Sequence, residues 1–154
     1  MTMQKIHQTV TMGIFLILSC ITNGYAGEAF PISTLKINQA RFTIEIATTQ
    51  AQQEQGLMNR KTMKDDAGML FVFEKSEPVF MWMKNTYISL DMVFIDEQGA
   101  IIQIAENTKP LSEAIISGTK PTKAVLELKA GTCKKQSIQI GDKVIYDTFS
   151  HPTH

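Results

Sequence analysis

The stretch from Phe80 to Asp96 constrains the fold more than any other part of the sequence. It reads FMWMKNTYISLDMVFID and holds the only tryptophan of the chain, Trp82, with a lysine and an aspartate placed among apolar residues. Two apolar runs joined by a turn at Lys84–Ser89 predict a hairpin of two antiparallel strands. We therefore expect a β-rich fold organised around this hairpin.

The expected pairing of this hairpin assigns its side chains to two faces. If Lys84 faces Asp91 across the turn, antiparallel pairing sets Trp82 opposite Val93. Because side chains alternate along a strand, Phe80 then shares the face of Trp82, Lys84 and Asp91. Both faces of the hairpin are largely apolar, so one is expected to pack in the core. The other is expected to be covered by protein or to line a cavity.

The charged residues of the hairpin allow two interpretations. In the first, Lys84 and Asp91 form an ion pair that fixes the loop, with Asn85 and Thr86 capping the turn. In the second, the aromatic residues floor a pocket and the polar residues at its mouth orient a ligand. Glu127 lies in an apolar strand as well, either as an outward residue or as a carboxylate of the site. The candidate ligand-binding residues are Phe80, Trp82, Lys84, Asn85, Asp91 and Glu127.

The rest of the chain alternates short apolar runs with turn residues, which is typical of strands. A short helix is expected after Thr48 and Thr49, which can cap it, and Gly56 ends it. A second helical turn is expected at Ala130–Lys135, whereas the polar stretch Glu106–Thr122 predicts a long loop. The further expected strands are Ser33–Ile37, Arg41–Ala47, Met69–Phe73, Ala100–Ala105, Lys123–Lys129 and Lys143–Asp147.

These patterns predict one fold class and one domain. The class is α+β but β-rich, a single small domain whose mostly antiparallel sheet is closed or nearly closed as a barrel, with one or two short helices. We expect residues 27–40 to form a lead-in and the first strand, residues 41–147 the domain, and residues 148–154 a C-terminal tail.

The first 26 residues carry the pattern of a secretory signal peptide. Lys5 precedes the apolar run Met12–Ile21, and Gly24 and Ala26 fit the small residues before a cleavage site. The run is too short to span a bilayer as a helix. We therefore expect an exported protein, periplasmic or extracellular, without a transmembrane span in the mature chain. The alternative is a lipoprotein anchored through Cys20.

Composition limits the partners and cofactors that we expect. The 15 Lys and Arg residues balance 15 Asp and Glu residues, and no basic stripe is present, so nucleic acid is not an expected partner.

Cleavage after Ala26 would leave Cys133 as the only cysteine of the mature chain, which excludes an internal disulfide. We expect Cys133 to be a small core or loop residue. The methionines are interpreted as core filler rather than copper ligands. No metal and no cofactor are expected, and an unknown small molecule is the partner considered.

Several motifs in a fixed order make the chain similar to one known family. The motifs are Gly56-Leu57-Met58 with Arg60, Gly68 to Phe73, Trp82 to Thr86 with Leu90-Asp91, Phe94 to Asp96, Val125 to Leu128 with Ala130-Gly131, and Gly141-Asp142. With them, residues 41–144 resemble the domain of unknown function 192 family, found in many bacteria and archaea. Met81 departs from the aromatic residue usual before the tryptophan, and the Glu106–Thr122 loop lacks the cysteines of some members. The resemblance supplies no catalytic residues.

Two function classes remain after this reading. The first is a small-ligand-binding or accessory module with an aromatic-floored pocket at the Phe80–Asp96 hairpin. The second is a hydrolase-like enzyme in which Asp91 or Glu127 acts as general base and Lys84 stabilises developing negative charge. Binding is favoured because no histidine lies in the expected domain and no nucleophile–base pair is recognisable, so the catalytic residues stay unknown.

Overall fold

A computed structural model describes residues 29–149 of the chain. The predictions for the signal peptide, for the lipid anchor at Cys20 and for the end of the tail lie outside these residues.

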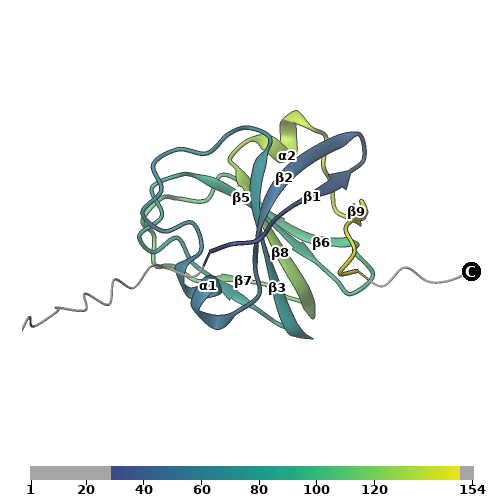
Figure 1. Ribbon diagram of the computed structural model, residues 1–154, viewed down its shortest axis with the longest axis horizontal. Helices are drawn as coiled ribbons and strands as arrows, with labels where there is room; N and C mark the ends of the chain where they lie inside the picture. The colour runs from purple at the N-terminus through teal and green to yellow at the C-terminus, as the bar shows by residue number, and fades with distance from the viewer. Residues whose placement is uncertain (1–28, 150–154) are drawn as a thin grey trace, which may run out of the picture.

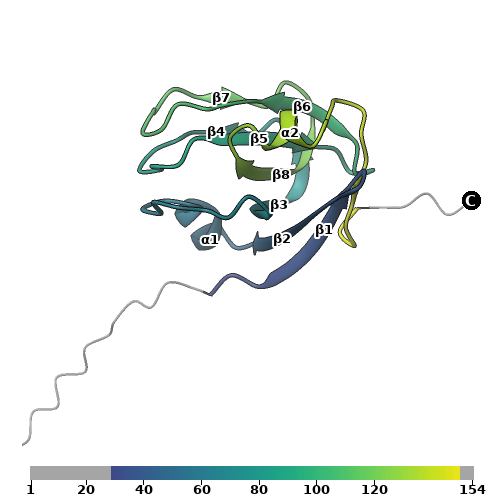
Figure 2. The same cartoon turned by 90° about the horizontal axis from the view of Figure 1, so that it is seen from above.

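A seven-stranded sheet forms most of the molecule and curls into a half-barrel (Figures 1 and 2). Its order is β6-β5-β8-β3-β2-β1-β9, and all neighbours are antiparallel except the parallel pair β2–β3. The strands are β1 (Ile32–Ile37), β2 (Ala40–Ala47), β3 (Ala67–Glu77), β5 (Leu90–Ile95), β6 (Ile101–Ala105), β8 (Thr122–Lys129) and β9 (Val144–Ile145).

The two ends of this curled sheet meet at one place. An isolated antiparallel bridge joins Ala100 to Lys143, and the amide of Val144 donates to the carbonyl of Gly99 at 2.8 Å. Gly99 has φ +76°, and a Cβ added there would lie 2.8 Å from the Val144 carbonyl oxygen. Only glycine fits this contact without displacing β9. The expectation of a β-rich α+β domain, nearly closed as a barrel, is confirmed.

Two short helices and a small second sheet complete the described part. They are α1 (Gln50–Gln55), α2 (Thr132–Lys135), and the two-stranded sheet of β4 (Phe80–Met81) with β7 (Ile116–Ser117). β7 lies inside the segment expected to be a loop. Figures 1 and 2 show α1 and the second sheet at the same end of the molecule, away from β9.

The N-terminal half contains the local structure expected of it. β1 and β2 form a hairpin with Asn38 at φ 53° in its turn. Thr49 caps α1 in a capping box with Gln52, as the sequence predicts, and Gly56 ends the helix. Gln52 is 3% exposed, and its amide oxygen accepts from the amides of Thr48 and Thr49. This buried side chain fixes where α1 starts.

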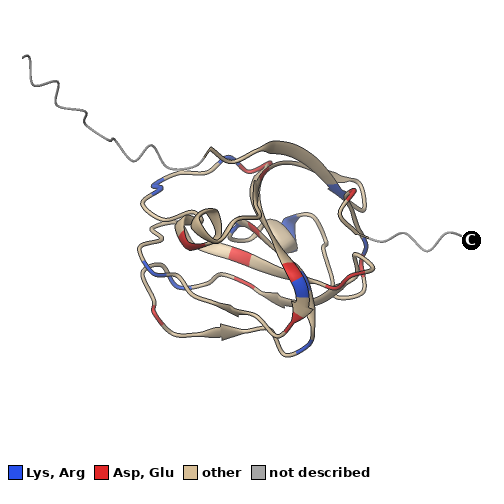
Figure 3. Ribbon diagram, turned by 60° about the horizontal axis from the view of Figure 1, so that its bottom comes forward, with Lys and Arg blue, Asp and Glu red and all other residues tan. Residues whose placement is uncertain are grey.

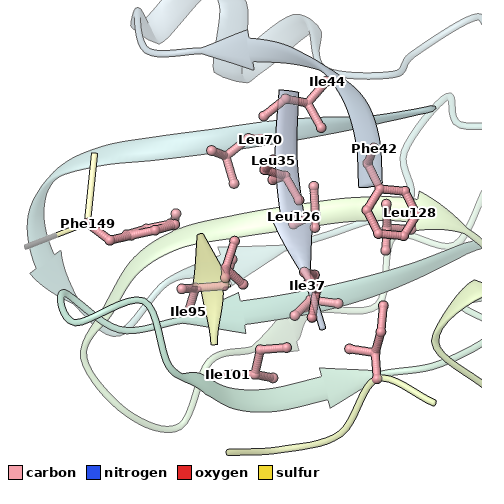
Figure 4. Packing of buried hydrophobic residues seen from close by; sticks show 14 of the residues in the cluster. Leu35, Ile37, Phe42, Ile44, Leu70, Ile95, Ile101, Leu126, Leu128 and Phe149 are labelled. Carbon is pink, nitrogen blue, oxygen red and sulfur yellow. The ribbon is translucent and has the colours of Figure 1, made fainter. Parts of the chain in front are cut away.

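Apolar side chains pack on both faces of the sheet. Inside the curl, leucine and isoleucine side chains from the strands meet Phe42 and Phe149 (Figure 4). On the other face, Leu90, Met92 and Phe94 of β5 join a second cluster with residues of β3 and the loop after β4. β5 is buried along its whole length because it has a covered face on either side and a strand at either edge.

The predicted central hairpin is wrong. β4 pairs with β7, with Phe80 opposite Ser117, whereas β5 pairs with β6 and β8. A strand has two hydrogen-bonding edges, and both edges of β5 are occupied. The segment between β4 and β5 is therefore no tight turn: the amide of Met83 donates to Ser112, and the amide of Leu111 donates to Thr86. These bonds attach it to the chain before β7.

Candidate functional site

An open cavity of about 270 Å³ lies at the α1 end of the molecule. α1 and the turn that follows it form one wall, β3 and β8 the floor, and the chain from β4 to Thr86 the opposite wall. The residues that line it are Gln50, Gln53, Glu54, Gln55, Gly56, Leu57, Met58, Phe71, Phe73, Phe80, Met81, Trp82, Lys84, Thr86 and Glu127.

Aromatic rings supply much of the apolar surface of the cavity. Phe71 and Phe73 lie two residues apart on β3, so their side chains leave the sheet on the same face. Phe71 is buried, whereas Phe80 and Trp82 are 69% and 46% exposed. The rings of Phe80 and Trp82 therefore lie at the solvent side of a cavity whose deeper part is formed by the sheet.

Glu127 is the one charged residue that the sheet contributes to this cavity. Its strand β8 lies between β3 and β5, and the register places Met69 and Met92 on either side of it. Glu127 is 4% exposed, and within the described chain its carboxyl group makes no hydrogen bond or ion pair. Its oxygens still reach the open cavity, because none of the described side-chain oxygens and nitrogens is both fully buried and unpaired. Desolvation by burial raises the pKa of Glu127 to about 8. An acid of this kind is largely protonated at neutral pH.

Glutamine side chains of α1 face the cavity opposite this carboxyl group. The side-chain amide nitrogen of Gln53 donates to the carbonyl oxygens of Ala47 and Val72, at 3.4 and 2.9 Å. Two carbonyl acceptors fix the orientation of the amide, because only the nitrogen end can donate to them. The amide nitrogen of Gln50 donates to Glu54 at 2.8 Å. The helix thus presents acceptor oxygens on this wall.

Lys84 is the cation of the cavity wall, and it lies beside the tryptophan. Its Nζ stands 5.2 Å from the centroid of the Trp82 ring, within the range of a cation–π interaction. Asn85 follows in the left-handed region, with φ 53°, and its carbonyl oxygen accepts from the amide of Asn59. Asn85 is exposed and does not line the cavity.

Asp91 lies on the opposite face of the sheet from Glu127. The register pairs Asp91 with Leu128 and places Glu127 beside the next residue of β5, so the two carboxyl groups point to opposite faces. Asp91 is fully buried and accepts from the amides of Asn107 and Cys133, both at 2.9 Å. It holds the chain after β6 and the start of α2, and the predicted pairing with Lys84 is wrong because the hairpin does not form.

The cavity thus contains four of the six residues proposed from the sequence. Phe80, Trp82, Lys84 and Glu127 line it, whereas Asn85 and Asp91 do not. The sequence reasoning missed the floor and the helical wall. The alternation of Phe71 and Phe73 within one strand was a signal for the floor. No local pattern points to Gln53, whose role depends on the packing of α1 against β2 and β3.

The other reactive groups of residues 29–149 are weaker candidates for a functional site. Cys133 is buried as expected, and burial together with the nearby Asp91 carboxylate raises the pKa of its thiol to about 12, which disfavours the reactive thiolate. Across these residues, no group of three or more His, Cys, Asp and Glu side chains is placed to hold a metal ion. The same stretch of chain contains no helix with the length and apolar character needed to cross a membrane.

The fold and the motifs together define the class of protein. The sequence profile of the DUF192 family, described as "Uncharacterized ACR", matches residues 33–146. The chain belongs to this family.

Two solved structures support this assignment. A protein of Sinorhizobium meliloti 1021, described as a "putative transcription regulator", is 44% identical with a TM-score of 0.74, covering 77% of this chain and 95% of its own. A protein of unknown function from Novosphingobium aromaticivorans DSM 12444 is 34% identical with a TM-score of 0.73, covering 75% of this chain and 85% of its own. Among curated proteins, nothing matches.

Proposed function

We propose that this domain is a small-ligand-binding module and that the cavity floored by Glu127 is its binding site. The observation that carries the proposal is the Glu127 carboxyl group, which lines the cavity from a 4% exposed residue and makes no hydrogen bond or ion pair within residues 29–149. Its oxygens reach the open cavity, because no side-chain oxygen or nitrogen of the described residues is both fully buried and unpaired. The carboxyl group is largely desolvated there, and a ligand that bonds to it would replace the hydrogen bonds that burial restricts.

The surroundings of Glu127 suit a ligand with an apolar body. Phe71 and Phe73 offer apolar surface at the floor, and Trp82 and Phe80 border the mouth. Small-molecule sites combine apolar and aromatic surface with polar groups that orient the ligand, and the lining of this cavity contains both. The side chains of Phe80 and Trp82 are exposed, although burying their rings would be favourable. A bound molecule would cover them.

A fragment screen by ligand-detected NMR tests this proposal. Small aromatic and aliphatic fragments that bind should compete for one site and change the emission of Trp82, the only tryptophan. Binding should weaken in Trp82→Ala and Glu127→Gln and stay unchanged in Ile145→Ala, a matched exposed control on β9. Fragments that bind equally to all of these variants, or a screen without binders, would refute the proposal.

A hydrolase-like enzyme is the second candidate, and one observation favours it. Glu127 and Lys84 line the same cavity, and a carboxyl group with a pKa of about 8 is suited to general acid–base work near neutral pH. Asp91 drops out as the base because it lies on the other face. Turnover of an ester or amide panel that vanishes in Glu127→Gln would establish the enzyme, and fragment binding without turnover in any of them would establish the module.

The surface charge gives no support to a nucleic-acid-binding role. The description of the Sinorhizobium protein names a transcription regulator. In the present chain, however, Lys and Arg residues are dispersed among acidic ones around the ribbon (Figure 3). Proteins that bind nucleic acid usually gather positive charge on one face, so we do not include this role in the proposal.

We also propose that the module works outside the cytoplasm. The support is the apolar run Met12–Ile21 with the small residues Gly24 and Ala26. Intact-mass measurement of the protein from its native host should show a chain that starts at Gly27. A diacylated chain that starts at Cys20 would indicate the lipoprotein alternative, and a full-length chain would refute export.

A further inference from the structure

The geometry of the cavity points to an organic ammonium ion as its ligand, with the ammonium group against Glu127 and the apolar body between the aromatic rings. This inference rests on the proposed binding function and adds the chemical class of the ligand.

The floor and the helical wall of the cavity offer acceptors. The carboxyl group of Glu127 makes no hydrogen bond or ion pair within the described chain, and the nitrogen of the Gln53 amide is turned toward two backbone carbonyls, which leaves its oxygen to accept. Glu54 adds a second carboxylate on the α1 wall, where it accepts from Gln50. Acceptors need donors, and a protonated amine carries up to three N–H donors and a positive charge.

The aromatic rings suit a cationic group as well as an apolar one. The face of an aromatic ring attracts cations through its quadrupole, best of all in tryptophan. One face of Trp82 is already in use in this way, because the Lys84 ammonium stands over it at 5.2 Å. Phe71 and Phe73 lie deeper and face the same cavity without a cation of their own. A ligand cation at the floor would have both rings and the carboxylate beside it.

The position of Lys84 restricts which ammonium ions can bind in the cavity. Its position at the wall formed after β4 places one positive charge toward the mouth, which disfavours a second positive charge on the ligand there. The floor, by contrast, has Glu127 and no cation. The fitting ligand is therefore a monocation whose distal end is neutral or anionic, rather than a polyamine.

Binding of an ammonium ion should release one proton from the Glu127 carboxyl group. The charged side chains around Glu127 are Glu54 from α1 and Lys84 after β4, while β3 and β5 present Met69 and Met92 beside it. Burial favours the protonated form of Glu127, since it raises the pKa of this group to about 8. When the ammonium ion binds, the carboxyl O–H bond breaks, the proton passes to water and the carboxylate pairs with the cation. Affinity should therefore rise with pH.

Benzylammonium and benzyl alcohol form a matched pair of probes for this inference. They have the same shape, and one carries a positive charge where the other has a hydroxyl group. Titrations of the full chain, followed by calorimetry and by Trp82 emission, should give an affinity for benzylammonium about tenfold or more above that for benzyl alcohol. Benzoate, with a negative charge, should not bind.

Variants and pH identify the group that holds the cation. Glu127→Gln should lower the affinity for benzylammonium by about tenfold or more, whereas Glu97→Gln, an exposed carboxylate outside the cavity, should leave it unchanged. Tetramethylammonium keeps its charge at every pH, so its affinity should rise between about pH 6 and pH 8 through Glu127 alone. Glu127→Gln should remove that rise.

The outcomes separate this inference from the proposed function. Binding of benzyl alcohol as tight as that of benzylammonium, or an unchanged affinity in Glu127→Gln, overturns the ammonium ion while leaving a ligand site. Absence of any Trp82 response to all probes and fragments overturns both. Nα-acetyl-lysine methylamide distinguishes the sources: tighter binding than n-butylammonium indicates a lysine of a peptide, and weaker binding a free amine.

Discussion

Asp91 and Glu127 lie on neighbouring strands, and both are buried carboxyl groups in apolar surroundings. Their environments differ in one respect. Asp91 accepts two backbone N–H groups at 2.9 Å, whereas the Glu127 carboxyl group accepts no hydrogen bond within the described chain. The first therefore holds two chain segments, and the second is the group that we propose meets a ligand.

Asp91→Ala should destabilise the domain more than Asp96→Ala. The first change leaves the amides of Asn107 and Cys133 without their acceptor in a buried place, which should cost roughly 2–4 kcal/mol. Asp96 also accepts two amides, from Gln98 and Ala100, but in a turn where water can replace it, so about 1 kcal/mol is expected. Urea unfolding measures both, and equal midpoints at equal slopes would contradict the assignment.

Glu127 should make stability depend on pH in the opposite sense to a paired carboxylate. Its pKa is about 8 in the folded state against 4.5 for an exposed glutamate, so folding takes up a proton between these values. The contribution is therefore complete below about pH 4.5 and is lost as pH rises to about 8, roughly 3–5 kcal/mol in all at about 1.4 kcal/mol per unit.

The measurement is the difference in unfolding free energy between Glu127→Gln and the unchanged protein across this range. The variant should gain on the unchanged protein as pH rises, because glutamine does not ionise. A difference that stays flat from pH 4.5 to pH 8 would show that the carboxyl group is not desolvated.

At the scale of elements, α1 decides the shape of the cavity. It has only six residues, too few to be stable alone, so its position depends on contacts with the sheet. Gln53 attaches the helix to β2 and β3 through the carbonyl oxygens of Ala47 and Val72. The buried Gln52 holds the start of the helix, because its side chain accepts from the amides of Thr48 and Thr49 and donates to the carbonyl oxygen of Ala29 at 3.1 Å. The cavity wall therefore depends also on Gln52, which does not line it.

Gln52→Ala should cost roughly 1–3 kcal/mol because it removes a buried side chain that accepts from the amides of Thr48 and Thr49 and donates to Ala29. Gln55→Ala, an exposed position of the same helix, is the matched control and should change stability by less than about 0.5 kcal/mol. Thermal or urea unfolding measures the difference. Gln52→Ala should also weaken fragment binding, and a variant that unfolds and binds as the unchanged protein would contradict the role given to Gln52.

The elements also show what the sequence could predict. The β1–β2 hairpin and α1 are coded locally, by alternation around Asn38 and by a capping box at Thr49, and both form as expected. The pairing of β4 could not be predicted, because its partner β7 is a two-residue strand inside a polar segment. Nothing near Phe80 in the sequence indicates that both edges of β5 are taken by distant strands.

For the molecule as a whole, the residues of the candidate site were likewise only partly predictable from the sequence. Glu127 and Trp82 stood out because a charge and a large ring in apolar runs are visible in any single sequence. Their meeting with Gln53 and Phe73 depends on the parallel pairing of β2 with β3 and on β8 lying between β3 and β5. These are contacts between residues far apart in the chain, which local patterns do not specify.

The closure of the half-barrel depends on residues near the C-terminal end of the described chain. Phe149 is 2% exposed, packs in the cluster inside the curl and meets Tyr146 edge to face. Phe149→Ala should cost roughly 3–5 kcal/mol by leaving a cavity. Ile145→Ala, at an exposed position of β9, should cost less than about 0.5 kcal/mol. Equal unfolding midpoints for the two variants would show that this segment is not part of the core.

Titration of the Glu127 carboxyl group measures whether it is a desolvated acid at the floor of the cavity. In protein labelled with ¹³C at glutamate side chains, the resonance that is missing from Glu127→Gln identifies this group, and its shift is followed with pH in the absence of ligand. The account predicts a midpoint near pH 8, the value of a buried carboxyl group without a donor, and a fall when benzylammonium saturates the site. A midpoint near 4.5, the ordinary value of glutamate, would contradict it.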